Sequence, residues 1–225
     1  MKNREEIDKN LCSSIILDLK EDIQTKNQAS LLVSGGSTPI NLFELLSNAD
    51  LEWEKVSISL VDDRFLPDDH KDQNGSMVRK LLIQNKAAKA KFIPLMQDSS
   101  DITRSIEMAN KAFKVVSQPF SSVILGMGND GHTASLFPDC DELDGGMDLN
   151  NENTIIKTEP KTAPYQRISL TRKAILNTKS LYLHFYGDEK LKVFEAAGKN
   201  DTYRPFPIQA FINQSEKQLK VFKAK

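Results

Sequence analysis

Apolar residues recur along this chain in two alternating patterns, one with helical spacing and one in short runs. A helical repeat opens the chain and predicts an amphipathic helix, through Ile7, Leu11, Ile15, Ile16, Leu19 and Ile23. Short apolar runs, typical of buried strands, lie at 29–33, 56–61, 123–125, 154–157, 167–170, 180–185 and 219–222. Helices are predicted at about 39–47, 74–84, 102–117, 171–176 and 187–197, with an extended piece at 93–95 and a helical turn at 207–212. Pro39 is expected to be the first residue of its helix.

The alternation of strands and helices predicts an α/β fold, with a mostly parallel sheet that helices cover on both faces in a Rossmann-like arrangement. The length of 225 residues, without an evident linker, predicts a single domain over residues 1–225. Ligands of such sheets bind beyond the carboxyl ends of the strands. The candidate functional residues are therefore the polar residues that follow the predicted strands.

The strand at 123–125 leads into the most informative stretch of the chain, which contains Gly126, Gly128 and Gly131. Glycine allows a sharp turn, a positive φ and a close approach of the backbone to a ligand. Residues 133–137 are predicted to form the first turn of a helix that the following proline ends. A helix N-terminus here would offer a ligand unpaired N–H groups and a partial positive charge.

His132, one of three histidines in the chain, follows the glycine turn. Imidazole transfers protons near neutral pH, and Asp130 is placed to fix its tautomer and favour the imidazolium. Residues 126–131 also match the G-x-G-x-x-G pattern of dinucleotide-binding proteins. That pattern requires a second strand ending in an acidic residue about 20 positions later. Residues 139–153 are acidic and not strand-like, so a nicotinamide cofactor is disfavoured and no cofactor is expected.

Two more polar stretches follow predicted strands. The loop at 34–38 combines glycines with hydroxyl side chains before a helix, which suits a phosphate held by backbone N–H groups. A tight turn with an N-cap explains this loop equally well, and it lacks the Gly-Lys-Ser/Thr of a Walker A loop. Asp62, Asp63 and Arg64 follow the next strand. Such carboxylates can hold a metal or act as a base, and the arginine can pair with a phosphate, although a solvated charge run is the alternative.

Arg167 begins a predicted strand, and Lys190 lies in the first turn of a predicted helix. The helix dipole disfavours a cation at that end, so an anionic ligand nearby would explain Lys190, with an exposed lysine as the alternative. His70 is expected at the surface and His184 in the core. The three histidines lack the spacing of metal ligands, so no metal site is predicted. The absence of a G-x-S-x-G elbow disfavours a serine nucleophile.

The composition excludes several classes of partner. A net charge of −1 disfavours a nucleic-acid surface. No segment approaches 18 consecutive apolar residues, so we expect no membrane span, and the polar first ten residues do not resemble a signal peptide. Cys12 and Cys140 are far apart and are expected to be reduced thiols in a cytoplasmic protein.

Taken together, these stretches resemble the 6-phosphogluconolactonase family. The matching stretches are Ser-Gly-Gly-Ser-Thr-Pro at 34–39, Val-Asp-Asp-Arg-Phe-Leu-Pro at 61–67 with Asp69, His70 and Asn74 after it, Leu-Gly-Met-Gly-Asn-Asp-Gly-His-Thr-Ala-Ser-Leu-Phe-Pro at 125–138, Arg-Ile-Ser-Leu-Thr at 167–171, and the turn at 187–190. The run from Gly131 to Phe137 is the most specific of them. The resemblance implies a fold shared with glucosamine-6-phosphate deaminases, ribose-5-phosphate isomerases and CoA transferases.

The resemblance also implies an activity, the hydrolysis of 6-phospho-D-glucono-1,5-lactone in the second step of the oxidative pentose phosphate pathway, without metal or cofactor. It implies that His132 is the general base, that Asp130 orients it, and that Asp62 contacts sugar hydroxyls or assists acid–base chemistry. The residues that it implies in substrate binding are Gly35, Gly36, Ser37, Thr38, Arg64, Gly131, Arg167 and Lys190. The expected partner is the small sugar-phosphate lactone, bound by a monomer or weak homo-oligomer.

Two departures and two alternatives accompany this resemblance. Asp63 stands where the family usually has glutamate, and Lys161 is offset from the family's usual lysine, so we assign it no role. A glucosamine-6-phosphate deaminase-like enzyme is one alternative, but residues 62–64 and 131–137 differ from the deaminase motifs. A non-catalytic sugar-phosphate sensor is the other, and the presence of His132 and Asp130 argues against it.

Overall fold

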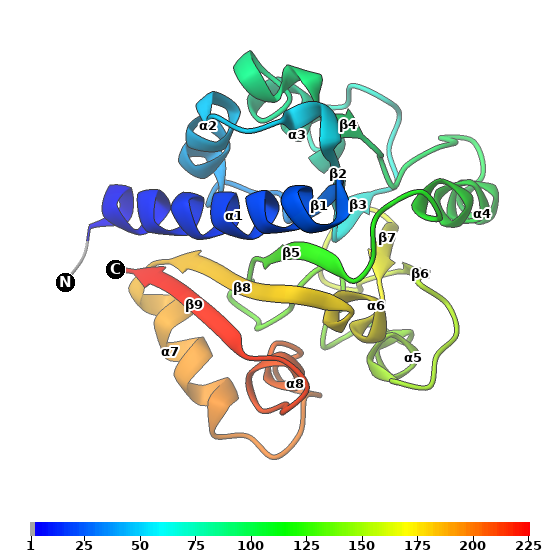
Figure 1. Cartoon of the computed structure of the whole chain (residues 1–225). Helices are drawn as coiled ribbons and strands as arrows, with labels where there is room; N and C mark the ends of the chain where they lie inside the picture. Colours follow the sequence, from blue (N-terminus) through cyan, green and yellow to red (C-terminus); the bar gives the residue numbers. More distant parts are fainter. Residues whose placement is uncertain (1–2) are drawn as a thin grey trace.

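The computed structural model describes residues 3–225, and a six-stranded sheet forms the centre of this part of the chain. Its strands are β1 Ala29–Val33, β2 Val56–Leu60, β4 Lys91–Phe92, β5 Phe120–Leu125, β8 Thr178–Tyr186 and β9 Leu219–Ala224. They lie in the order β4-β2-β1-β5-β8-β9, and every neighbouring pair is parallel (Figure 1). All residues of β1 and β5 are buried, as expected for central strands of a parallel sheet. The predicted α/β fold with a mostly parallel sheet is confirmed.

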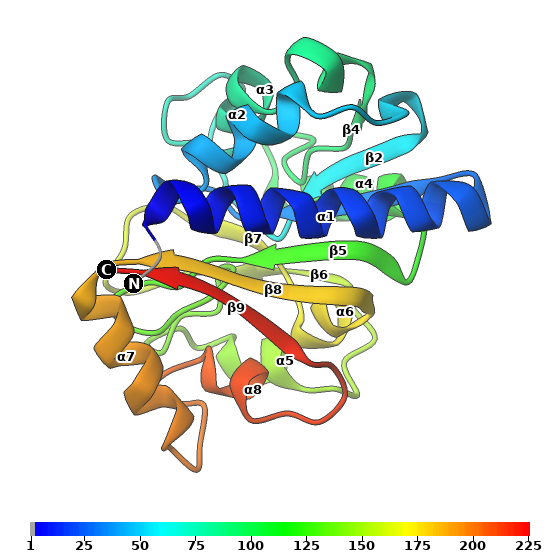
Figure 2. The ribbon, with the colours of Figure 1, turned by 60° about the vertical axis from the view of Figure 1, so that its left-hand side comes forward.

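Helices flank this sheet. They are α1 Arg4–Lys26, α2 Ile40–Asn48, α3 Asn74–Leu81, α4 Ile102–Phe113, α5 Leu143–Met147, α6 Arg172–Leu176, α7 Asp188–Gly198 and α8 Gln209–Ile212, with 3-10 turns η1 Trp53–Lys55 and η2 Asn85–Lys89. The buried face of α1, including Leu11, Ile15 and Leu19, packs on β1, β5 and β9. Figure 2 shows α1 in front of the central strands and α4 behind them. None of the helices in residues 3–225 combines the length and apolar character needed to cross a bilayer.

A second, three-stranded sheet holds part of the candidate site. It consists of β3 Asp62–Arg64, β7 Arg167–Leu170 and β6 Ile155–Thr158, in the order β3-β7-β6 with antiparallel pairing. Val61 joins the two sheets, because its N–H donates to Val33 O (3.0 Å) and its carbonyl accepts from Leu170 N (2.8 Å). The sequence predicted strands at 154–157 and 167–170, but it predicted neither the strand β3, whose residues were expected only to follow the strand at 56–61, nor the separate sheet. The consequence for the site is that Arg64 is paired directly with Arg167.

The predicted helical turn at residues 133–137 is wrong. These residues form a tight turn in which Leu136 N donates to Thr133 O at 3.0 Å, and Ala134 has a φ of 49°. A left-handed residue inside the first turn is incompatible with an α-helix. The expected helix N-terminus beside His132 is therefore absent from the described chain.

Other boundaries differ by a few residues. Pro39 is the N-cap of α2 and not its first helical residue. Helix α4 ends at Phe113, helix α3 ends at Leu81, and the extended piece expected at 93–95 is the strand β4 two residues earlier. Thr171, the first residue of the helix expected at 171–176, is the N-cap of α6, and its side chain accepts from Ala174 N at 3.3 Å.

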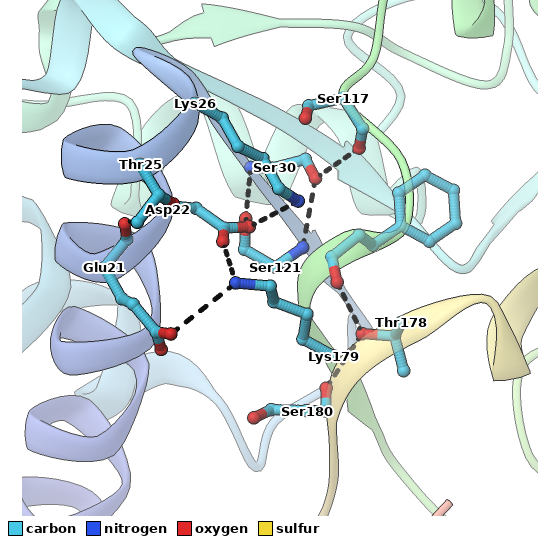
Figure 3. A network of polar contacts seen from close by, with 11 residues as sticks. Glu21, Asp22, Thr25, Lys26, Ser30, Ser117, Ser121, Thr178, Lys179 and Ser180 are labelled. Carbon is cyan, nitrogen blue, oxygen red and sulfur yellow. Dashed lines mark hydrogen bonds and ion pairs between the residues drawn. The ribbon is translucent and has the colours of Figure 1, made fainter. Parts of the chain in front are cut away.

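A polar cluster around the buried Asp22 carboxylate ties α1 to the amino ends of the central strands, and we call it the amino-end cluster (Figure 3). It consists of Asp22, Lys26, Ser30, Ser121 and Lys179. The Asp22 carboxylate accepts from Ser121 Oγ (2.6 Å), pairs with Lys26 Nζ (3.3 Å) and accepts from Lys179 Nζ. Ser30 N in turn donates to Ser121 Oγ at 3.0 Å. These bonds join α1 to β1, β5 and β8.

Candidate active site

A cavity of about 380 Å³ lies at the opposite end of the sheet, where β1, β2, β5 and β8 end. Its lining residues are Ser34, Gly35, Gly36, Ser37, Thr38, Asp62, Arg64, Asn74, Gly126, Met127, Gly128, His132, Thr133, Ala134, Phe137, Ala163, Arg167 and Lys190. Most of the residues that the sequence nominated for the site are therefore brought together in one place, although they come from widely separated parts of the chain. Asp130 and Gly131 are not among the lining residues.

His132 and Asp130 form a hydrogen-bonded pair at the edge of the cavity. His132 Nδ1 lies 2.6 Å from Asp130 Oδ1, and the backbone N–H of His132 donates to the same oxygen at 3.1 Å. Partial burial favours the protonated form of Asp130, but the bonds from His132 outweigh it and hold the pKa of Asp130 below its usual range. An ionised Asp130 accepts the proton on Nδ1, which leaves the lone pair of the neutral imidazole on Nε2. His132 lines the cavity, and its side chain is 29% exposed.

Glycines allow this pair to form. Gly128 N donates to His132 O at 2.9 Å, and a Cβ on Gly128 would lie only 2.2 Å from His132 Nδ1. Gly131 has a φ of 77°, and a Cβ there would lie 2.8 Å from a ring carbon of Phe206. Gly131 therefore shapes the turn behind His132, whereas the sequence had nominated it for substrate contact.

The loop after β1 lines the other side of the cavity, as its Ser-Gly-Gly-Ser-Thr sequence suggested. Gly36 has a φ of 89°, which favours glycine. A Cβ on Gly35 would lie 2.0 Å from Asn74 Oδ1, so only glycine fits beside that amide. Ser34 Oγ accepts from Gly126 N at 2.9 Å and donates to Ile124 O at 3.0 Å, which joins this loop to the glycine turn after β5.

Three cations line the cavity. Arg64 donates from Nη1 to Asp72 O, and Arg167 donates from Nη2 to Pro164 O at 2.9 Å. The Nε atoms of both arginines are buried and lack a partner among residues 3–225. Burial, together with the positive charge of Arg64, lowers the pKa of Arg167, and burial lowers the pKa of Lys190. The lowered pKa values of Arg167 and Lys190 show that their positive charges are poorly solvated. An anionic ligand would stabilise these charges, so the cavity favours such a ligand.

Asp62 and Asp63 are adjacent in sequence, but one side chain lines the cavity and the other is buried as an acceptor of backbone hydrogen bonds. Asp62 lines the cavity, and its Oδ2 accepts from Ser135 Oγ at 2.5 Å. Asp63 is fully buried and accepts from the backbone N–H groups of Arg64 (2.7 Å), Asn74 (2.7 Å) and Gly75 (2.9 Å). Burial raises the pKa of Asp63 to about 7, against the effect of these three donors. Asp63 thus orients Arg64 through its backbone and secures the start of α3.

Sequence reasoning missed Asn74 and Phe137 as cavity residues. Asn74 Nδ2 donates to Asp62 O at 3.0 Å, and its side chain touches the loop that carries Gly35. Both residues belong to the stretches that resemble the family, and this resemblance was the only feature of the sequence that could have indicated a place in the cavity. Their side-chain directions depend on tertiary contacts that no local pattern encodes.

Four side chains to which the sequence assigned no role in the site lie outside the cavity, namely His184, Lys161, Cys12 and Cys140. His184 is 2% exposed and lies 3.0 Å from Asp8 Oδ1, which confirms the core histidine. Lys161 forms an exposed ion pair with Asp141 at 2.5 Å and does not line the cavity. Cys12 and Cys140 are free thiols, and burial raises the pKa of each to about 11. No group of three or more His, Cys, Asp or Glu residues in the described chain is arranged to bind a metal ion.

Comparison with known proteins places this architecture in a family. The family model described as glucosamine-6-phosphate isomerases/6-phosphogluconolactonase matches residues 2–221. The chain belongs to this family. It is 36% identical to a 6-phosphogluconolactonase of Neisseria meningitidis over 225 residues, covering 99% of this chain and 96% of the relative. It is 40% identical to the 6-phosphogluconolactonase of Helicobacter pylori over 205 residues, covering 90% and 87%.

Solved structures agree with this assignment. A crystal structure of a 6-phosphogluconolactonase from Shewanella baltica has a TM-score of 0.97 and 38% identity, and covers 100% of this chain and 96% of that one. The 6-phosphogluconolactonase from Trypanosoma brucei has a TM-score of 0.82 at 22% identity, covering 99% and 94%, so it shows the shared fold alone. The family resemblance expected from the motifs is confirmed.

Proposed function

We propose that this chain is a 6-phosphogluconolactonase that hydrolyses 6-phospho-D-glucono-1,5-lactone to 6-phospho-D-gluconate. The relatives with 36% and 40% identity carry this name over nearly the whole chain. The geometric observation that carries the proposal is an Asp-paired imidazole in the same cavity as three cationic side chains. A proton acceptor and an anion-binding region in one cavity suit an ester that carries a phosphate.

The phosphate is assigned to the cationic side of the cavity. Arg64, Arg167 and Lys190 supply positive charge there. The unpartnered Nε atoms of the two arginines are donors that a phosphate oxygen can satisfy. Backbone N–H groups of residues 35–38 contribute in the way that loops before helices hold anions. Asp62, whose second oxygen binds Ser135, accepts hydrogen bonds from sugar hydroxyls.

The chemistry is assigned to His132. Nε2 removes a proton from water while the water oxygen attacks C1 of the lactone and forms a tetrahedral oxyanion. The oxyanion collapses, the bond between C1 and the ring oxygen breaks, and the imidazolium returns the proton to that oxygen. Such general acid–base catalysis typically contributes about 10²–10⁴-fold to the rate. Asp130 stabilises the imidazolium through its bond to Nδ1.

The glycine turn after β5 is suited to stabilise the oxyanion. Gly126 N donates to Ser34 Oγ and Gly128 N donates to His132 O, both at 2.9 Å. Met127 lies between these two glycines and lines the cavity, and we assign its N–H to the oxyanion. The reaction would be the second step of the oxidative pentose phosphate pathway, and we place it in the cytoplasm with the chain acting as a monomer or weak homo-oligomer.

The test is the disappearance of lactone that glucose-6-phosphate dehydrogenase generates in the same vessel, measured above the spontaneous rate with and without EDTA. The expected result is a faster loss that survives EDTA. The His132→Ala variant serves as the matched control for contaminating activity.

Absence of acceleration would overturn the lactonase proposal. The family also contains glucosamine-6-phosphate isomerases, so ammonia release from glucosamine 6-phosphate would then be measured. Failure of both reactions, with retained binding of a sugar phosphate, would support the sensor alternative.

A further inference from the structure

The aromatic ring of Phe137 contacts two groups that the proposed function needs. The ring stacks on the His132 imidazole, with centroids 4.0 Å apart and planes inclined by 22°. The guanidinium carbon of Arg167 lies over the same ring, 5.7 Å from its centroid. Phe137 is 4% exposed and lines the cavity. We propose that Phe137 is a positioning residue that holds the base and the phosphate-binding arginine in fixed relation, an inference that rests on the proposed lactonase activity.

The imidazole needs such a support. The bond from Nδ1 to Asp130 fixes one atom of the ring, but torsion about the terminal bond of a histidine side chain is broad. With 29% of its side chain exposed, His132 is not held by a surrounding core. A flat ring 4.0 Å away limits the plane of the imidazole and therefore the direction of its Nε2 lone pair. Stacking also stabilises aromatic pairs.

Arg167 is held in a similar way. Its Nη2 donates to Pro164 O at 2.9 Å, while its Nε has no partner among residues 3–225. The face of Phe137 supports the guanidinium through a cation–π contact without using any of its N–H donors. The remaining donors stay available for a phosphate.

The tight turn after His132 explains how one ring reaches both groups. In an α-helix, residues 132 and 137 would point roughly 140° apart, because each residue advances about 100°. The Thr133–Leu136 bridge and the φ of 49° at Ala134 reverse the chain instead and return Phe137 to the imidazole. The non-helical turn thus builds the contact between Phe137 and His132.

The kinetic test is Phe137→Leu, which keeps an apolar side chain but removes the flat ring. We expect kcat to fall about tenfold, because small misplacement of a catalytic group is costly. We expect KM to rise roughly two- to fivefold, the range that loss of a cation–π contact predicts. The matched control is Phe92→Leu, since the Arg79 guanidinium lies 4.9 Å from the Phe92 centroid and neither residue lines the cavity. Phe92→Leu should change neither constant.

A spectroscopic test needs no lactonase activity. A ring stacked on His132 moves the imidazole proton resonances upfield, and only two other histidines are present for assignment. Comparison with the spectrum of His132→Ala identifies the signals. We expect upfield His132 signals in the unaltered protein that return towards ordinary positions in Phe137→Leu.

The outcomes separate the inference from the proposed function. Unshifted His132 resonances in the unaltered protein, or kinetics of Phe137→Leu equal to those of Phe92→Leu, would overturn the inference. If the unaltered protein does not hydrolyse the lactone, the proposed function fails, and the affinity for 6-phosphogluconate replaces KM as the readout. Unchanged affinity in Phe137→Leu would then overturn the positioning role, and weaker affinity would support its Arg167 part.

Discussion

The amino-end cluster and the cavity occupy opposite ends of the same sheet and use the same kinds of side chain in opposite ways. At the amino ends, the Asp22 carboxylate is bonded to Lys26, Ser121 and Lys179. At the carboxyl ends, Arg64 and Arg167 each have a buried Nε without a partner among the described residues. One group of charges is satisfied by the chain itself, and the other is not.

This difference distinguishes a structural polar cluster from a ligand site. Buried polar groups are normally hydrogen-bonded, so unpaired donors on two arginines that line a cavity indicate a missing ligand. Maintaining poorly solvated cations side by side costs stability, and proteins tolerate such costs mainly at functional sites. Substitutions at the two ends should therefore separate activity from stability.

The largest effect is expected for His132→Ala. Loss of the proposed base should lower kcat by at least about 10²-fold, given the range for general acid–base catalysis. The free energy of unfolding should change little, because the His132 side chain is 29% exposed. Steady-state kinetics and urea unfolding measure the two quantities. A near-normal kcat would remove His132 from the mechanism.

Asp22→Ala should do the opposite of His132→Ala, because it should lower stability and leave kcat unchanged. It removes a fully buried carboxylate, so Ser121 Oγ loses its acceptor and Lys179 keeps only its longer pair with Glu21 at 3.8 Å, which should lower the free energy of unfolding by about 2–4 kcal/mol. The kcat of the folded variant should be unchanged, because the cluster lies at the other end of the sheet.

The matched control for this variant is Asp50→Ala. Asp50 pairs with Lys86 at 3.3 Å but is 95% exposed, so its loss should cost less than about 0.5 kcal/mol. Equal destabilisation by the two variants would contradict the structural importance of the amino-end cluster.

Arg167→Ala should raise KM by roughly 10- to 100-fold, the range expected when a charge-assisted hydrogen bond to an anion is lost. The kcat should fall by a much smaller factor, since the proton acceptor remains. Arg104→Ala is the control, because Arg104 forms an ion pair with Asp98 and is 68% exposed. An unchanged KM in Arg167→Ala would exclude it from the phosphate site.

The parallel sheet was predictable from the sequence for a definite reason. Strands such as β1 and β5 are buried on every residue, so they appear as continuous apolar runs between helical repeats. The polar residues after these strands could be assigned to one edge of the sheet, because parallel strands end on the same side. This reasoning alone brought the loop at 34–38, Asp62 and His132 together.

What the sequence could not predict depends on contacts between distant segments. The turn at 133–137 has helical residue types, but the Thr133–Leu136 bridge and the left-handed Ala134 replace the helix. The position of Arg167 opposite Arg64 requires the chain to leave the first sheet at Val61. Neither feature has a local pattern, so local propensity gave the wrong turn and no indication of the second sheet.

The smallest effect concerns the dependence of stability on pH. Burial opposes ionisation of Asp22, but hydrogen bonds from Lys179 and Ser121 and the charge of Lys26 hold its pKa below the usual range. A carboxyl group with a lowered pKa in the folded state contributes stability above its unfolded pKa of about 3.9, and this contribution is lost as the pH falls below that value. The difference in unfolding free energy between the unaltered protein and Asp22→Asn should therefore be constant from pH 7 to 5. It should shrink by on the order of 1 kcal/mol by pH 3. Urea unfolding at pH 7, 5, 4 and 3 measures this difference in unfolding free energy. A difference that grows as the pH falls would show that the fold stabilises the neutral form of Asp22. The amino-end cluster would then not be ionic.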